Sequence, residues 1–406
     1  SLEIAVRGGG HGVAGKALTD GGLVIDLRRM NWVAVDPERH TATVGGGATM
    51  SDLDRATEPF GLVTTGGRVS TTGIGGLALG GGSGWLDRKF GLACDNVLAA
   101  EIVLADGRHL RVSEEEHPDL FWALHGGGGN FGVVTSFTFR LYPLPAVTAM
   151  LLLWPADAGP AIACAYRDFM LDAPDEVGVG LMFLTAPAED FVPPALVGKL
   201  ACGIIGGYAG PERAARQAMA PLLALGHAGE LLAEVSYAEL QCMFDDPPGY
   251  RNYWSAEYLR EFPDAAVDRF CARAWDTIVP SPSQHVLFPG GGAVARGPAE
   301  YPIPWRHAPW CVHPFGLWTD AADDERARRW AHDLRADMQP WASGDVYLNF
   351  IGDEGQDRVI AGLGREHHAR LAAIKGVYDP DNIFHLNHNI VPDSGVSSAA
   401  IVANAR

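Results

Sequence analysis

One stretch of the chain, residues 66–85, constrains the fold more than any other part of the sequence. It holds nine glycines in 20 positions, interleaved with isoleucine, leucine and tryptophan. Ordering so many glycines costs a large amount of conformational entropy, and a flexible linker would carry serine rather than large apolar residues. The segment is therefore predicted to be ordered and buried against a flat ligand.

Two further glycine clusters lie beside strand-like runs. Residues 7–12 (RGGGHG) directly follow the run LEIAV, and residues 126–135 lead into a strand. Consecutive glycines leave backbone N–H groups free to converge on an anion such as a pyrophosphate. The first cluster has neither the G-x-x-x-x-G-K-[ST] pattern nor a G-x-G-x-x-G followed by a helix, which excludes P-loop and Rossmann sites. Taken alone, such a loop is equally compatible with an ordinary turn.

Charge and hydropathy narrow the classes of partner. Asp and Glu number 49 against 31 Lys and Arg, a net charge of −18, whereas nucleic-acid binding needs clustered positive charge. The longest apolar run, residues 149–154, is far shorter than a membrane span and ends at Pro155. Six scattered cysteines without C-x-x-C predict buried thiols in a reducing compartment. Because the chain also opens on a strand-like run without a signal-peptide pattern, we expect a cytoplasmic protein with no membrane or nucleic-acid partner.

The distribution of strand-like runs and helical patterns along the chain predicts an α+β fold. Residues 1–145 combine glycine with short β-type runs, and Thr49 or Ser51 is expected to cap a helix. From about residue 146 longer helical patterns alternate with strands, which suggests a second α+β domain with helices on one side of its sheet. Later strands are expected at 177–184, 199–208 and 346–351, and helices at 211–225, 265–277, 323–338 and 359–378.

The order of several motifs resembles one known family. The chain is similar to flavin-linked oxidases of the berberine bridge enzyme type, within the vanillyl alcohol oxidase (PCMH-type) superfamily. The resemblance covers most of residues 1–145 and 345–392 and is weak between them. The matching segments are 6–12, 24–27, 66–84, 87–96, 119–124, 126–135, 347–350 and 378–390.

The family resemblance implies a domain arrangement. A two-part FAD-binding domain would comprise residues 1–145 and 345–392, and residues 146–344 would form an inserted α+β substrate-binding domain, an antiparallel sheet covered by helices. Residues 393–406 would be a loose tail. Relatives carry some tens of residues before the position of Ser1, so the adenine side of the cofactor site is expected to be incomplete.

The resemblance also implies a covalent FAD. His11 corresponds to the histidine that binds the flavin 8α-methyl group, although its local context alone is as compatible with a histidine that caps a glycine turn. Val69 stands where doubly linked relatives have a cysteine, and no thiol lies between His11 and Cys94, so one covalent link is expected. The other expected cofactor-binding residues are Arg7, Gly8, Gly9, Gly10, Gly12, Gly66, Gly67, Ser70, Gly73, Gly75, Gly76, Gly80, Gly84, Val133, Val134, Asn387 and Asn389.

The implied activity is an oxidase reaction on a small organic substrate, with hydride passing to flavin N5 and electrons to O2 to give hydrogen peroxide. Tyr347 and Asn349 are the predicted catalytic residues, and Tyr347 as a packed aromatic in a buried strand is the alternative. Two other functions stay open, a flavin dehydrogenase with another acceptor and an inactive flavin- or ligand-binding relative. The substrate and the choice between monomer and homodimer stay undetermined.

Two further sets of residues are candidates for a functional role, as pocket residues or as metal ligands. Four residues of the middle segment could line the substrate pocket or simply pack: Tyr253, Trp254, Glu257 and Tyr258. The histidines at 367–368 and 385–388 lack the spacing of metal ligands, so no metal site is expected.

Overall fold

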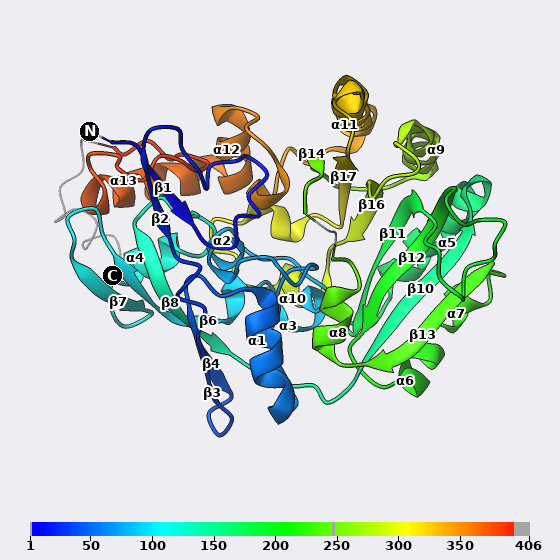
Figure 1. Cartoon of the computed structure of the whole chain (residues 1–406), viewed down its shortest axis with the longest axis horizontal. Helices are drawn as coiled ribbons and strands as arrows, with labels where there is room; N and C mark the ends of the chain where they lie inside the picture. The colour runs from blue at the N-terminus through cyan, green and yellow to red at the C-terminus, as the bar shows by residue number, and fades with distance from the viewer. Residues whose placement is uncertain (1, 246–247, 394–406) are drawn as a thin grey trace.

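Two β-sheets at opposite ends of the molecule define the fold (Figure 1). The structure, a computed structural model, describes residues 2–245 and 248–393. The predicted α+β fold is confirmed, and the predicted tail after Asp393 lies outside the described residues. The helices are α1 (Met50–Thr57), α2 (Ile74–Leu79), α3 (Asp87–Phe90), α4 (Pro118–Ala123), α5 (Gly159–Leu171), α6 (Glu212–Ala218), α7 (Ala220–Leu223), α8 (Tyr237–Cys242), α9 (Asp264–Arg273), α10 (Gly292–Arg296), α11 (Asp324–Met338), α12 (Gln356–Leu363) and α13 (Arg365–Tyr378).

The first sheet has five antiparallel strands in the order β3-β4-β8-β6-β7. Helix α1 begins at Thr49, whose side chain accepts from the backbone N–H of Asp52 while Asp52 binds back to Thr49. This capping box satisfies two N-terminal N–H groups and confirms Thr49 as the N-cap. The strands are β3 (Val33–Asp36), β4 (Thr41–Gly45), β6 (Val97–Val103), β7 (His109–Ser113) and β8 (Val133–Arg140).

The second sheet has eight antiparallel strands, and its central strands are buried on both faces. Along β10, residues 149, 151 and 153 belong to the buried cluster that contains the first sheet, while 150, 152 and 154 belong to a second cluster with residues of α5, α9 and α11. Both layers follow from the two-residue period of a strand. The order is β13-β10-β12-β11-β16-β17-β14, with β15 also paired to β17. Its strands are β10 (Val147–Pro155), β11 (Val177–Thr185), β12 (Leu200–Tyr208), β13 (Gly229–Val235), β14 (Arg251–Trp254), β15 (Glu257–Leu259), β16 (Gln284–Pro289) and β17 (Trp310–Trp318).

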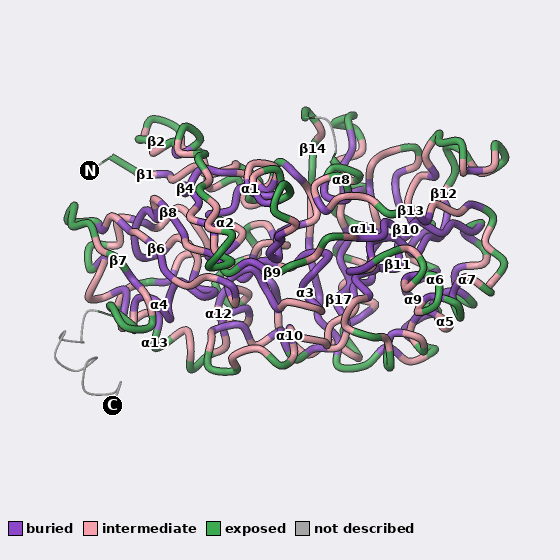
Figure 2. Tube along the Cα trace, turned by 90° about the horizontal axis from the view of Figure 1, so that it is seen from below, coloured by how far each residue is buried: buried purple, intermediate pink, exposed green. Residues whose placement is uncertain are grey.

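The last part of the chain returns to the first sheet. The segment after α13 packs against the parallel pair β1 (Ile4–Arg7) and β2 (Leu23–Asp26), because Ile383 and Phe384 share a buried cluster with Ile4, Val6 and Ile25. A smaller antiparallel pair, β5 (Leu62–Val63) with β9 (Tyr142–Pro143), lies where the chain passes from the first sheet to the second. Figure 2 shows buried residues running through both sheets and between them.

Three predicted elements differ from the structure. The strand expected at 346–351 is wrong, since Leu348–Phe350 form a 3-10 turn that brings Tyr347 and Asn349 against the glycine-rich segment. The helix expected at 359–378 is interrupted at Gly364, whose φ of 76° ends α12 before α13 begins. The helix expected at 211–225 is split because Pro221 lacks the N–H that a continuous helix needs, and α7 starts anew there.

The sequence-based expectations about the cysteines, membrane-spanning segments and metal sites concern side chains and helices that the structure describes. All six cysteines are free, and four are buried, while Cys164 is half-buried and Cys242 is exposed. Among the helices of residues 2–245 and 248–393, none combines the length and hydropathy needed to cross a bilayer. The same residues contain no group of three or more His, Cys, Asp or Glu side chains placed to hold a metal ion.

Asp54 gives a pH-dependent contribution to stability. Its carboxyl group is buried between α1 and Gln241 of α8, Oδ2 has no hydrogen-bond partner among the described residues, and burial raises its pKa to about 8. Between pH 4 and 8 the folded state therefore holds a proton that the unfolded state has lost, so stability falls as pH rises.

We expect Asp54→Asn to remove this dependence. The free energy of unfolding of the variant should rise relative to the parent by at least about 2 kcal/mol between pH 5 and pH 8, measured by urea denaturation. Glu115→Gln, at an exposed carboxylate, is the control and should show no such trend. Parallel stability curves for Asp54→Asn and the parent would contradict the argument.

Candidate active site

A cavity of about 370 Å³ separates the glycine loops from the second sheet. One wall is formed by the loop after β1, by residues 67–85 and by residues 126–132, and the other by β11, β16 and β17. The segment after residue 346 closes the cavity from the side. Segments far apart in the sequence therefore line one cavity, the usual form of a small-molecule site.

The glycine loops pack against each other through their backbones. A Cβ atom added to Gly9 would overlap the backbone nitrogen of Gly73, and one added to Gly73 would overlap that of Gly9. Gly10 has a φ of 80°, which glycine adopts without strain. Gly12 and Gly76 also line the cavity and have open space where a side chain would stand. Bare backbone thus forms this wall, as predicted for residues 66–85.

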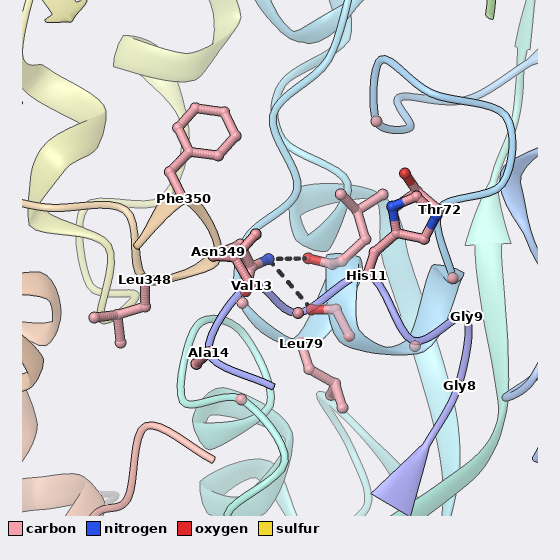
Figure 3. A pocket seen from close by; sticks show the side chains of 18 of the residues that line it. Gly8, Gly9, His11, Val13, Ala14, Thr72, Leu79, Leu348, Asn349 and Phe350 are labelled. Atoms are coloured by element: carbon pink, nitrogen blue, oxygen red, sulfur yellow. Dashed lines mark hydrogen bonds between the residues drawn. The ribbon is translucent and has the colours of Figure 1, made fainter. Parts of the chain in front are cut away.

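His11 lies in the cavity wall next to Thr71 and Thr72 (Figure 3). The distance from His11 Nε2 to Thr71 Oγ1 is 2.8 Å, so Nε2 is hydrogen-bonded, whereas Nδ1 has no hydrogen-bond partner among the described residues. Burial lowers the pKa of His11, and the nearby Asp245 opposes that shift. Asp245 also accepts the Ser70 backbone N–H, at 2.7 Å from N to Oδ1, which ties the loop after α8 to this wall.

Tyr347 and Asn349 form a hydrogen-bonded pair on the glycine-rich segment. The Tyr347 hydroxyl oxygen accepts from the Gly82 backbone N–H at 2.9 Å and from Asn349 Nδ2 at 3.0 Å. Asn349 Nδ2 also donates to the carbonyls of Gly76 and Leu77, at 3.3 and 3.4 Å (Figure 3). Burial raises the pKa of Tyr347 to about 12, although its hydrogen bonds oppose that shift. The phenol therefore stays protonated at neutral pH, and its proton has no acceptor among the described residues.

His313 on β17 is a functional candidate that the sequence did not reveal. Its Nδ1 lies 2.7 Å from the Ser255 carbonyl oxygen, and since a carbonyl only accepts, Nδ1 carries the proton. Burial lowers the pKa of His313 to about 4. The ring is stacked on Phe350, with 4.2 Å between centroids, and lines the cavity. Nε2 therefore offers an unprotonated lone pair with no partner among the described residues.

The structure brings most of the predicted site residues together. Trp254 also lines the cavity, whereas Tyr253, Glu257 and Tyr258 do not, and Glu257 instead pairs with Arg335 and Arg358. Predicted residues that line the cavity are Gly8, Gly9, Gly10, His11, Gly12, Gly67, Val69, Gly73, Gly75, Gly76, Gly80, Val134, Tyr347, Asn349 and Asn387. Those that lie behind the lining are Arg7, Gly66, Ser70, Gly84, Val133 and Asn389.

A buried lysine fixes the C-terminal loop that carries Asn387. Lys375 Nζ donates to Phe384 O at 2.9 Å and to the Oδ1 atoms of Asn130 and Asn389 at 3.2 Å, and lies 3.6 Å from Asp379. The loop is thereby joined to residues 126–132 across the cavity floor. These contacts position Asn387 without placing Lys375 itself in the cavity.

The cavity suits the FAD implied by the family resemblance. Its lining contains the cations Lys16 and Arg68 but no Asp or Glu, in a chain of net charge −18, so a pyrophosphate would meet no negative side chain. Asn387 Nδ2 donates to the Gly129 and Phe384 carbonyls, which leaves Oδ1 as a buried acceptor without a described partner. Bare glycine backbone and an unused acceptor are features that a bound dinucleotide would satisfy.

Comparison with known protein families gives two matches in this chain. Residues 1–113 match the FAD binding domain family, and residues 346–391 match the family described as berberine and berberine like. The first match contains the cavity-lining residues of the loop after β1 and of residues 67–85, and the second contains those at 347–351 and 384–388.

Curated and solved relatives match nearly the whole chain. (R)-6-hydroxynicotine oxidase of Paenarthrobacter nicotinovorans is 33% identical, over 97% of this chain and 86% of that protein. The solved structure of 6-hydroxy-D-nicotine oxidase from Arthrobacter nicotinovorans has a TM-score of 0.83 and 29% identity, covering 97% of this chain and 87% of that one. Berberine bridge enzyme from Eschscholzia californica, at 22% identity, shares the fold with a TM-score of 0.84 and covers 98% of this chain and 86% of that one.

Proposed function

The chain belongs to the berberine bridge enzyme-like family of FAD-linked oxidoreductases, and from that premise we propose that it is an oxidase of a small organic substrate. When bound, the flavin would accept hydride from a substrate carbon and pass two electrons to O2 to give hydrogen peroxide. The observation that carries the proposal is the shared cavity, where a carboxylate-free glycine cradle meets Tyr347 and His313.

The chain supplies a proton acceptor and a hydrogen-bond donor. The substrate heteroatom loses a proton as the neighbouring C–H bond breaks, and His313 Nε2, unprotonated above about pH 4, takes that proton. Tyr347 stays protonated, and its O–H donates a hydrogen bond to the substrate, because its oxygen already accepts hydrogen bonds from Gly82 and Asn349. Asn349 therefore acts as a positioning residue for Tyr347. The stack of His313 on Phe350 fixes the imidazole plane.

The division into domains is also a proposal. We infer that residues 1–145 and 345–392 bind the cofactor and that residues 146–344 form the substrate-binding domain. All strands of the five-stranded sheet fall between residues 33 and 140, and those of the eight-stranded sheet between 147 and 318, which supports this division.

A covalent flavin is the first expected result. The purified protein should be yellow, and the colour should stay with the pellet after acid precipitation. We expect the bond at His11 Nδ1, because Thr71 occupies Nε2. His11→Ala should release the colour to the supernatant, and mass spectrometry of the parent should place the flavin on the peptide containing residue 11.

Two outcomes would contradict parts of this proposal. Colour retained in the His11→Ala pellet would place the link elsewhere, and a parent protein that cannot take up FAD would overturn the oxidase. Substrate-dependent bleaching without oxygen, followed by peroxide when air is admitted, would support the oxidase. Bleaching without peroxide would indicate a dehydrogenase with another acceptor.

A further inference from the structure

Arg68 places a positive charge at the end of the cavity that faces the second sheet. Its guanidinium carbon lies 4.0 Å from the ring centroid of Phe288 on β16 and 5.2 Å from that of Trp85. Arg68, Phe288 and Trp85 all line the cavity. The side chain starts in the glycine-rich segment and reaches the sheet, so its charge lies between the two walls of the cavity.

The hydrogen bonds of Arg68 leave part of the guanidinium unused. NH1 and NH2 lie 3.2 Å from Ser83 Oγ, and NH2 lies 3.2 Å from the Gly84 carbonyl oxygen. Nε is buried and has no hydrogen-bond partner among the described residues. A buried N–H donor of this kind is costly unless something accepts from it.

The charge around Arg68 is only partly balanced. Asp87 is the nearest carboxylate, 3.6 Å from Arg68 NH2, but it already accepts from Ser83 Oγ at 2.6 Å and from the Gly84 N–H at 3.2 Å. Asp87 does not line the cavity, and neither does any other Asp or Glu of the described residues. The other lining cation, Lys16, pairs with Asp353 at 2.9 Å. Arg68 is therefore a cation that lines a cavity without any lining carboxylate.

The walls around this charge are aromatic. Phe315 lies 4.1 Å from Trp254 between ring centroids, Phe350 stacks on His313, and all four rings line the cavity. Aromatic faces favour flat, apolar ligands, and the few polar groups among them fix the orientation of the ligand.

We propose that the substrate is a flat aromatic molecule with one anionic group, such as a carboxylate, which Arg68 binds. The ring would lie among the aromatic side chains, with the oxidisable C–H toward Tyr347 and His313. This inference rests on the proposed function and specifies its substrate class. A cationic amine would meet Arg68 without any lining carboxylate to balance it, so it would bind poorly.

Size-matched aromatic probes test the proposal on the FAD-loaded protein. Benzoate, benzamide and benzylamine would be titrated, with quenching of tryptophan fluorescence and perturbation of the flavin absorbance as two readouts, since Trp85 and Trp254 line the cavity. We expect benzoate to bind at least about tenfold more tightly than benzamide, and benzylamine to bind most weakly.

Substitutions then assign the preference to Arg68. Arg68→Met should weaken benzoate binding at least about tenfold and leave benzamide nearly unchanged, whereas Arg68→Lys should keep part of the preference. Arg329→Met is the matched control, because Arg329 is an exposed residue whose ion-pair partner among the described residues is Glu325. If Arg68→Met fails to fold because Asp87 loses its partner, Arg68→Lys and the ligand order of the parent decide.

The outcomes separate this inference from the proposed function. Benzylamine binding as tightly as benzoate, or a folded Arg68→Met protein with unchanged benzoate affinity, would overturn the role of Arg68. Tryptophan quenching requires no flavin, so failure of FAD uptake would contradict the oxidase while leaving the anion preference measurable.

Discussion

Replacement of His313 by glutamine will slow substrate-dependent flavin reduction by about 100-fold or more, with a much smaller change in KM. General-base catalysis contributes about 10² to 10⁴ in rate, and glutamine offers no nitrogen lone pair that could take the proton. Stopped-flow reduction under anaerobic conditions measures the step directly. Tyr347→Phe should slow the same step less, because it removes a hydrogen-bond donor and not the proton acceptor.

His285→Gln is the matched control for His313. His285 is also buried, its pKa is lowered to about 3 by burial, and its Nε2 lies 2.9 Å from the Phe270 carbonyl, but it does not line the cavity. In the control, substrate should reduce the flavin as fast as in the parent. Equal rates for His313→Gln and the parent would exclude His313 as the proton acceptor.

The pH profile of the parent gives an independent check. Burial lowers the pKa of His313 to about 4 and raises that of Tyr347 to about 12. The required forms are neutral His313 and protonated Tyr347, so the rate should fall only as pH drops through about 4 or rises through about 12. An acid inflection near pH 6.5, the ordinary histidine value, would show that His313 is solvated.

Replacement of Lys375 by methionine will destabilise the protein by about 3–5 kcal/mol. Lys375 and Asp379 are both fully buried, and removing one partner of a buried pair leaves the other charge uncompensated. Two hydrogen bonds to the loop at 384–389 and one to Asn130 would be lost as well. Urea denaturation measures the loss, and the variant should take up less flavin than the parent because Asn387 loses its support.

Two further variants distinguish the buried pair from a general lysine effect. Lys89→Met removes a partly exposed pair with Glu176 and should cost less than about 1 kcal/mol. Lys375→Met combined with Asp379→Asn should recover part of the loss, since no buried charge is then left alone. A single Lys375→Met variant as stable as Lys89→Met would contradict the argument.

The sequence predicted the glycine-lined half of the site well because its signals are local. Nine glycines within residues 66–85 require close backbone packing wherever the chain places them, and Gly9 against Gly73 shows that packing. The strands predicted at 177–184 and 199–208 are likewise present as β11 and β12. The error at 346–351 arose where tertiary contacts override the local pattern, because the hydrogen bonds of Asn349 require a turn there. The errors at 211–225 and 359–378 arose at Pro221 and Gly364, which interrupt a helix locally.

The sequence alone could not predict which residues form the second half of the cavity. His313 and Phe315 share one face of β17 by the two-residue period, yet both faces of that sheet are buried and nothing local marks the face that meets the cavity. Arg68 stands among glycines, and only the packing of β16 brings Phe288 over its guanidinium.

The sequence by itself determined the family, the FAD-linked chemistry and the glycine cradle, because each depends on residue types at short, fixed spacing. Only the tertiary structure decided that His313 and Arg68 share a cavity with Tyr347, because the three residues come from distant segments. Their protonation states and partners arise from burial and contacts between those segments, which local spacing does not encode.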